Sequence, residues 1–192
     1  MSEPLRYHST RSAAPTVSIS QAIAAGLAPD GGLYVPDVLP SLDPAAFDPN
    51  GSLADTAATL LAPFFAGDAL AGALPAICAE AFTFDAPLRT LPAHPHTLML
   101  ELFHGPTSAF KDFGARFLAA CLRRLPREDA RPLTILVATS GDTGAAVAAA
   151  FHRQPNVRVV ILYPDVLRMQ GRRCQCDQRT NDSQVLHVTI PP

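Results

Sequence analysis

Lysine is almost missing from this chain of 192 residues: among its 15 basic side chains only Lys111 is a lysine, and the rest are arginines. A codon bias toward arginine explains the scarcity but not the exception. Arginine replaces lysine in solubility and ion pairing, whereas it cannot lose its proton and attack a carbonyl group as lysine can. The solitary lysine is therefore a candidate for chemistry.

Other absences exclude whole classes of protein. The formal net charge is only -2, so no broad attraction to nucleic acid or to an anionic membrane is expected. Residues 1–4 lack the charged-then-apolar pattern of a secretion signal, and Pro63 with Thr59 interrupts the most apolar stretch, short of the roughly 18 residues of a membrane-spanning helix. Four cysteines without secretory context indicate reduced thiols. We expect a cytoplasmic protein.

Residues 1–90 have the pattern of a small, mostly helical domain rich in proline. Three helices are expected, and each begins at a side chain that can accept hydrogen bonds from backbone amides. These starts are Ser18, paired with Gln21 and followed by Gly26; Ser52, paired with Asp55; and Asp68, whose helix Pro75 bends or divides. A glycine turn leading into a short extended segment is expected at 30–36.

Residues 91–164 alternate short apolar runs with helical patterns, which is typical of parallel-sheet units. The prolines of 87–95 indicate a boundary, where His94 and His96 are expected in a solvated linker. The predicted elements are a strand at 97–103, a helix at 110–125, a strand at 133–138, a helix at 143–152 and a strand at 157–162. The uninterrupted apolar run at 133–138 predicts a strand buried on both faces. The expected fold class is α/β, with an incomplete parallel sheet after the helical domain.

The last segment, 165–192, has no such pattern and is typical of a divergent tail that is disordered or weakly packed. Only 184–190 resembles a strand. Cys174 and Cys176 with His187 form one close cysteine pair without a second, which is a weak zinc signal. No metal site is expected.

The segment 104–112 lies between an expected strand and an expected helix. If Thr107 or Ser108 caps that helix, Lys111 lies in its first turn, where the positive end of the helix dipole disfavours an ammonium group. A neutral amine is the form that condenses with an aldehyde cofactor. Asp112 and Glu101 would oppose this effect by pairing with the ammonium group. The alternative is an ordinary solvated lysine at a helix start.

The segment 139–144 follows a predicted strand and opens a helix. Its residues are Thr139, Ser140, Gly141, Asp142, Thr143 and Gly144. Unpaired backbone amides at such a helix start bind carboxylate or phosphate, and ligands of open parallel sheets bind at this end of the strands. The alternative is an ordinary cap in which Ser140 or Asp142 satisfies the amides. Asp142 would also repel an anion unless it is protonated, turned away or paired.

The two segments together resemble a known family. Residues 101–115 resemble the cofactor-attachment pattern of the serine/threonine dehydratase and threonine synthase group, and His-Gly-Pro-Thr-x-Ala-Phe-Lys-Asp at 104–112 is similar to the threonine synthase form. Residues 138–146 are similar to the substrate loop of the same family, and 157–164 to the strand after it. Residues 7–11 and 26–36 resemble its leading domain. The resemblance extends from about residue 5 to residue 164.

This resemblance implies a fold type II enzyme that uses pyridoxal 5'-phosphate to convert O-phosphohomoserine and water to threonine and phosphate. Lys111 would carry the cofactor and move protons at substrate carbons, and Phe110 would pack beside the cofactor ring. Residues 139–143 would hold a phosphorylated amino-acid substrate through its carboxylate, and His104 is a weaker candidate near the site.

The sequence also departs from the family. Beyond Pro164 it no longer follows the family pattern, and the stretch that supplies the cofactor phosphate cradle and the partner of the pyridine nitrogen is not recognised, so a truncated chain is expected. Two alternatives stay open. One is a related phospho-lyase acting on other phosphorylated amino acids, and the other is a catalytically silent fragment, since parallel strands need cover on both faces.

Overall fold

The structure, a computed structural model, describes residues 4–126, 132–139, 141–164 and 185–190. The chain divides into two compact units: the first comprises Met1–Thr83 and Ala120–Pro126, and the second comprises Phe84–Ala119 and Arg127–Pro192. No helix in the described ranges is both long enough and apolar enough to cross a bilayer.

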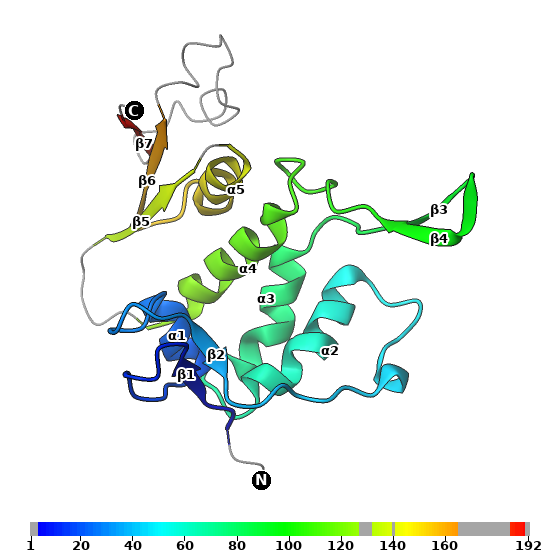
Figure 1. Ribbon diagram of the computed structural model, residues 1–192, viewed down its shortest axis with the longest axis horizontal. Helices are drawn as coiled ribbons and strands as arrows, with labels where there is room; N and C mark the ends of the chain where they lie inside the picture. The colour runs from blue at the N-terminus through cyan, green and yellow to red at the C-terminus, as the bar shows by residue number, and fades with distance from the viewer. Residues whose placement is uncertain (1–3, 127–131, 140, 165–184, 191–192) are drawn as a thin grey trace. The chain divides into compact units, whose positions relative to one another are not determined.

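The first unit is mostly helical, as the sequence predicts (Figure 1). Two short strands pair antiparallel at its start, with His8 opposite Val35. Its elements are β1 (Tyr7–Ser9), α1 (Ile19–Ala25), β2 (Tyr34–Pro36), the 3-10 turn η1 (Pro44–Ala46), α2 (Leu53–Phe65), the 3-10 turn η2 (Ala71–Ala73) and α3 (Leu74–Ala81).

Capping chemistry sets the helix boundaries in this unit. The Ser18 hydroxyl accepts from the Gln21 amide at 3.3 Å while the Gln21 side chain accepts from the Ser18 amide at 2.9 Å, so the predicted capping box of α1 is confirmed. Ser52 and Asp55 make the same reciprocal pair at the start of α2. Pro75 lies in the first turn of α3, where a missing amide costs little, and the prediction that it divides the third helical segment is confirmed.

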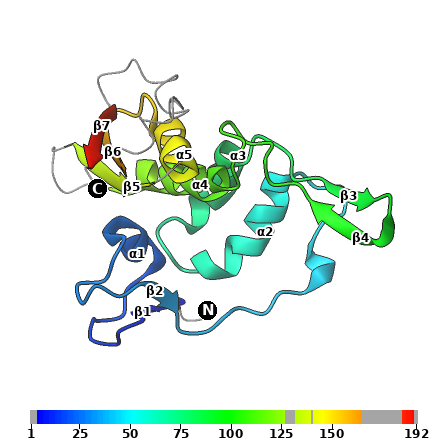
Figure 2. The same cartoon turned by 45° about the horizontal axis from the view of Figure 1, so that its top comes forward.

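The core of the first unit lies where α2 and α3 pack together, as both views show (Figures 1 and 2). Phe65, Ile77 and Cys78 are fully buried there. Asp68 ties α1 to this core, because its carboxylate accepts from the backbone amide and the hydroxyl of Ser20 and from the Leu70 amide at 2.9 Å. Burial acts to raise the pKa of Asp68, but these hydrogen bonds outweigh it and hold the pKa below its ordinary value.

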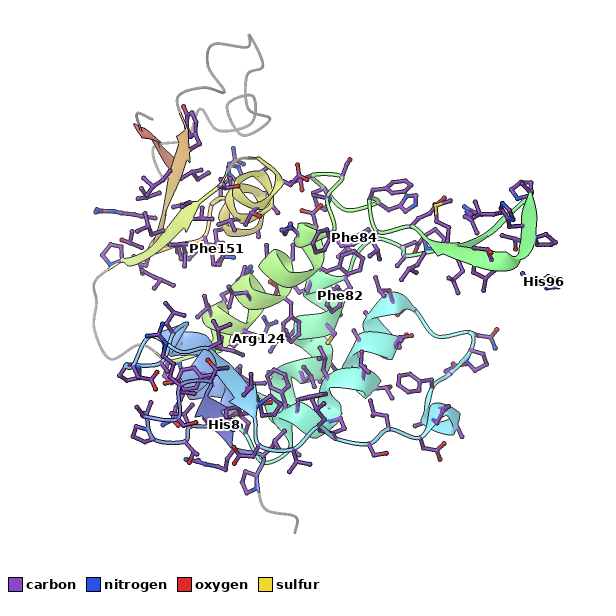
Figure 3. The ribbon with its side chains drawn as sticks, in the orientation of Figure 1. His8, Phe82, Phe84, His96, Arg124 and Phe151 are labelled. Atoms are coloured by element: carbon purple, nitrogen blue, oxygen red, sulfur yellow. The ribbon has the colours of Figure 1, made fainter. Side chains whose placement is uncertain are left out.

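The proline-rich boundary of the sequence is a β-hairpin, so two predictions are wrong here. Strand β3 (Leu88–Leu91) pairs antiparallel with β4 (His94–Leu100). The strand expected at 97–103 is therefore shifted: β4 begins three residues earlier and ends three residues earlier. Pro92 and Ala93 form the turn, and Pro95 is tolerated because a two-stranded ribbon has only edge strands. His96 therefore lies in a strand, near the hairpin tip, rather than in a linker (Figure 3).

The remaining elements of the second unit follow the predicted order. They are α4 (Lys111–Arg124), whose end belongs to the first unit, β5 (Leu133–Ala138), α5 (Asp142–Phe151), β6 (Val157–Pro164) and β7 (Val185–Ile190). The three strands form a parallel sheet of order β5-β6-β7, in which Ile135 lies opposite Val159. Strand β7 confirms the strand pattern seen at 184–190, whereas 165–184 lies outside the described residues.

One face of β5 is exposed, which contradicts the prediction of a strand buried on both faces. Exposure alternates along the strand, and the Leu136 side chain is 65% exposed. Helix α5 contacts β5 and β6, and Phe151 and Ile161 are buried between these elements. The sequence pattern is that of a doubly covered strand, but the described residues cover one face of it.

Candidate functional site

Lys111 is the first residue of α4, which confirms the prediction that it lies in the first turn of a helix. The expected cap is wrong, because a helix that starts at Lys111 begins after Thr107 and Ser108. These two residues lie instead in a tight turn, closed by a hydrogen bond from the Ser108 amide to the Gly105 carbonyl at 3.0 Å. Ser108 has a φ of 57°, in the left-handed region that non-glycine residues seldom adopt.

The Lys111 amine lies against an aromatic ring and not against a carboxylate. Its Nζ atom is 3.8 Å from the centre of the Phe110 ring, and the Phe110 side chain is 59% exposed. Within the described part of the chain, no carboxylate oxygen lies within 4 Å of the Lys111 amine. The pairing with Asp112 or Glu101 that would hold the amine as an ammonium ion is therefore not formed.

Asp112 is engaged elsewhere, inside the loop that precedes α4. Its carboxylate is completely buried and accepts from the Thr107 amide at 2.8 Å and from the Thr107 hydroxyl at 2.9 Å. Gly105 is the residue that makes room for it, because a Cβ atom at that position would lie 2.5 Å from the Asp112 Oδ2 atom. The three residues close the loop on itself directly before the lysine.

Glu101 and His104 form a second polar group at the end of the hairpin. The His104 Nε2 atom lies 2.7 Å from the Glu101 carboxylate, which Arg89 approaches at 3.8 Å. The His104 ring also stacks on Phe103, with the ring centres 4.8 Å apart. His104, the weaker candidate of the sequence, is thus an oriented imidazole, and Glu101 is the residue that orients it.

The 139–144 turn lies where the sequence predicts, between β5 and α5. Thr139 shapes it, because its hydroxyl oxygen accepts from the Gly141 amide at 3.1 Å and from the Gly144 amide at 3.3 Å. A Cβ atom at Gly144 would lie 2.5 Å from the Thr139 methyl group, so glycine is required for this close packing. Thr139 thus satisfies two amides of this turn, a role that the sequence analysis did not assign to it.

Two backbone amides at the start of α5 find no hydrogen-bond acceptor within the part of the chain that the structure describes. Among the described residues, the amides of Asp142 and Thr143 have no acceptor, and Gly141, the residue directly before α5, makes no side-chain cap of its own. Unpaired amides at the start of a ten-residue helix suit a carboxylate or phosphate group. Ser140, which the sequence also predicts in this site, lies outside the described residues.

The structure brings Phe110 and Lys111 together, and it joins Thr139, Gly141, Asp142 and Thr143 in one turn. Sequence reasoning missed the closure of the lysine loop by Gly105, Thr107 and Asp112. The one signal for it was the general tendency of Asp side chains to accept hydrogen bonds from nearby backbone amides, as Asp112 does from Thr107. No group of three or more possible metal ligands occurs in the described ranges, and Cys174 and Cys176 lie outside them.

These features define a class: an α/β protein in which a lysine opens a helix and an amide-rich turn follows a parallel strand. Residues 6–82 match the family described as the threonine synthase N terminus. Threonine synthase of Haemophilus influenzae is 46% identical over 148 residues, which cover 77% of this chain, and that of Escherichia coli is 44% identical over 150 residues. The chain belongs to the threonine synthase family and corresponds to its N-terminal part.

Solved structures agree with this assignment. A threonine synthase from Brucella melitensis with bound pyridoxal phosphate superposes with a TM-score of 0.79 at 35% identity, over 97% of this chain and 41% of that one. The Escherichia coli enzyme also gives a TM-score of 0.79, at 36% identity. The chain spans about a third of the length of the curated relatives it matches, 34% for each of the two named above.

Proposed function

We propose that this chain carries the lysine attachment site of a threonine synthase, an enzyme that uses pyridoxal 5'-phosphate to convert O-phosphohomoserine and water to threonine and phosphate. The observation that carries the proposal is the state of Lys111. It is the only lysine of the chain, it opens a helix, and it lies against an exposed ring with its neighbouring carboxylates engaged elsewhere. A relative with bound pyridoxal phosphate superposes on almost the whole chain, which supports the choice of cofactor.

The residues present fit this cofactor at its aldehyde end. No carboxylate of the described residues competes for the Lys111 amine, lysine is the usual residue for attaching this cofactor, and the exposed Phe110 ring beside it offers an apolar surface for a flat heterocycle. When bound, pyridoxal phosphate supplies an electron sink that makes carbanions at the substrate accessible. The task of the chain is then to attach, orient and exchange protons.

Each part of the chain has a role in that task. Lys111 holds the cofactor and then moves a proton at the substrate carbons through its Nζ atom. The unpaired amides of Asp142 and Thr143 bind the substrate carboxylate, and Thr139 and Gly141 hold the turn in the shape that presents them. His104, oriented by Glu101, is a second group able to exchange a proton.

The substrate class distinguishes the proposal from its alternatives. Phosphate release is measured with O-phosphohomoserine and with O-phosphothreonine, in the presence of pyridoxal phosphate, for the unaltered chain and for Lys111→Ala. Faster release from O-phosphohomoserine that depends on Lys111 supports the synthase. Faster release from O-phosphothreonine indicates the related phospho-lyase. No release from either, together with no cofactor attached at Lys111, indicates the catalytically silent fragment.

The partners follow from the same reading. We expect a small phosphorylated amino acid as substrate, and neither nucleic acid nor a membrane as partner, because the net charge of -2 provides no attraction to polyanions. The cytoplasmic location stays a prediction, supported by the composition of the chain.

A further inference from the structure

We infer that Asp112 is a positioning residue for Lys111: its buried carboxylate, held by Thr107 and accommodated by Gly105, fixes the loop from which the lysine emerges. The inference deepens the proposed function and depends on it. It concerns a side chain that no substrate reaches, since Asp112 is completely buried.

A buried carboxylate requires compensation, because removing a charge from water is costly unless hydrogen bonds replace the lost hydration. Asp112 finds its donors five residues back, in the amide and the hydroxyl of Thr107 at 2.8 and 2.9 Å. Hydrogen bonds to an ionised acceptor are about twice as strong as neutral ones. The carboxylate therefore holds the two ends of the 107–112 segment at a fixed separation.

Gly105 shows that this arrangement is tight. A Cβ atom there would lie 2.5 Å from the Asp112 Oδ2 atom and 2.7 Å from the Asp112 Cβ atom, distances at which the carboxylate would have to move. The turn from Gly105 to Ser108 and the hydrogen bond from the Asp112 amide to the Ala109 carbonyl, at 3.0 Å, complete the closed loop.

Lys111 immediately precedes Asp112, so the direction of its side chain is set by the backbone that this closure fixes. The geometry of a reacting group governs its rate, and a misplacement of about 1 Å costs up to about a hundredfold. Groups that support a reacting side chain without touching the substrate commonly supply this precision. Asp112, Thr107 and Gly105 are such supports.

A polypeptide of these 192 residues provides its own reference for a test, since Lys111 is its one lysine and the terminal amine, on Met1 in that polypeptide, is the other primary amine. The chain is treated with pyridoxal phosphate and borohydride, and peptide mapping by mass spectrometry gives the ratio of adduct at Lys111 to adduct at Met1. The same ratio in urea gives the intrinsic reactivity of the two amines. A native ratio above the urea ratio measures how far folding activates Lys111.

We expect Asp112→Ala and Gly105→Ala to lower the native ratio by about tenfold, toward the urea value. Asp112→Asn keeps an acceptor for the Thr107 amide and restores much of the ratio. Thr107→Val removes only the hydroxyl donor and lowers the ratio, whereas Thr107→Ser retains it and stays near the unaltered chain. Recovery by these conservative variants is not expected from a loss of stability alone.

Two controls test whether a variant changes the ratio only by losing stability. One is the thermal unfolding of each variant, and the other is Ser52→Ala, which weakens a helix cap in the first unit without touching this loop. Ser52→Ala should lower stability and leave the ratio unchanged. If Asp112→Ala does not fold, the Thr107 pair decides. If folded Asp112→Ala and Thr107→Val give the same native ratio as the unaltered chain, the positioning role is overturned and the proposed function is not. If the unaltered chain itself gives a native ratio equal to its urea ratio, the proposed function is overturned and the positioning role with it.

Discussion

Lys111 owes its availability to what its neighbours do. Glu101 is bound to His104 at 2.7 Å and Asp112 to Thr107, so neither carboxylate is left to hold the amine as an ion pair. The contact that remains, with the Phe110 ring, is worth about 0.5–1 kcal/mol at an exposed site. An attraction of that size orients the side chain and still permits it to leave the ring and react.

Two cysteines illustrate the opposite condition, in which a nucleophile is kept inert. Cys78 and Cys121 are completely buried free thiols. Burial raises the pKa of Cys78 from 9.0 to about 11 and, with a smaller contribution from the charge of Cys78, the pKa of Cys121 to about 12. The reactive thiolate form is thereby suppressed.

We predict that both thiols resist iodoacetamide in the native chain at pH 8. The raised pKa values reduce the thiolate at pH 8 about a hundredfold for Cys78 and about a thousandfold for Cys121, and burial excludes the reagent as well. Alkylation followed by peptide mapping measures each cysteine separately, with the urea-unfolded chain as the fast reference. Native rates close to the unfolded rates would contradict the burial of these two side chains.

The helix starts at the element scale come from short local patterns. Ser52 and Asp55 satisfy each other's backbone amides at the start of α2, and the hydroxyl and amide of Ser52 hold the pKa of Asp55 below its ordinary value. Such a cap acts through hydrogen bonds within four residues. Its effect is therefore open to a simple substitution.

Replacing Ser52 by alanine should lower the free energy of unfolding by about 1 kcal/mol, because the Asp55 amide at the start of α2 loses its hydroxyl acceptor. Urea unfolding measures the change. Ser52→Thr, which keeps the hydroxyl, serves as the matched control and should lose much less. Equal stability of the alanine variant and the unaltered chain would show that this cap does not stabilise the first unit.

The same local character explains how much of the fold could be predicted. The boundaries of α1 follow from capping residues, and those of β5 and α4 follow from apolar periodicity. Both are properties of neighbouring residues, and the predicted boundaries agree with the structure to within a residue or so. The hairpin was missed because its prolines are typical of a linker. A strand that pairs with only one neighbour accepts proline at an unpaired edge, and the sequence around Pro95 does not show which edge that is.

For a similar reason, the positions of the candidate site residues could be predicted but their hydrogen-bond partners could not. The positions of Lys111 and of the 139–144 turn follow from motifs that are contiguous in sequence. The partners of Glu101, Thr139 and Asp112 depend on how a loop folds back on itself, and each of these side chains had several possible donors or acceptors nearby. Sequence spacing alone does not choose among them.

At the scale of the whole molecule, three ionisable side chains of the first unit make the free energy of unfolding depend on pH in the alkaline range. Burial raises the pKa of Tyr7 from 10.0 to about 12, with a smaller contribution from the charge of Asp68, and the two buried thiols have values of about 11 and about 12. In each case the folded state favours the protonated, neutral form. The unfolded chain therefore loses these protons at a lower pH than the folded chain.

The contribution of these groups to the free energy of unfolding should consequently be constant below about pH 9 and fall between pH 9 and pH 12. Where the unfolded state binds fewer protons, the free energy of unfolding decreases with pH, by on the order of 1 kcal/mol per pH unit for each group. Urea unfolding at pH 7.5, 9 and 10.5 tests this, with Cys121→Ala as a variant expected to show a shallower decline. A free energy of unfolding that does not change over this range would contradict the burial of Tyr7 and of both thiols.

The central claim concerns the chain as a whole, because it assigns its single lysine to a cofactor. The decisive measurement is the site of attachment of pyridoxal phosphate after borohydride reduction, mapped by mass spectrometry in the unaltered chain and in Lys111→Arg. We predict that the native chain is labelled mainly at Lys111, far above its labelling in urea, and that Lys111→Arg retains only the background at the terminal amine. Labelling of Lys111 no greater in the native chain than in the unfolded one would contradict the account.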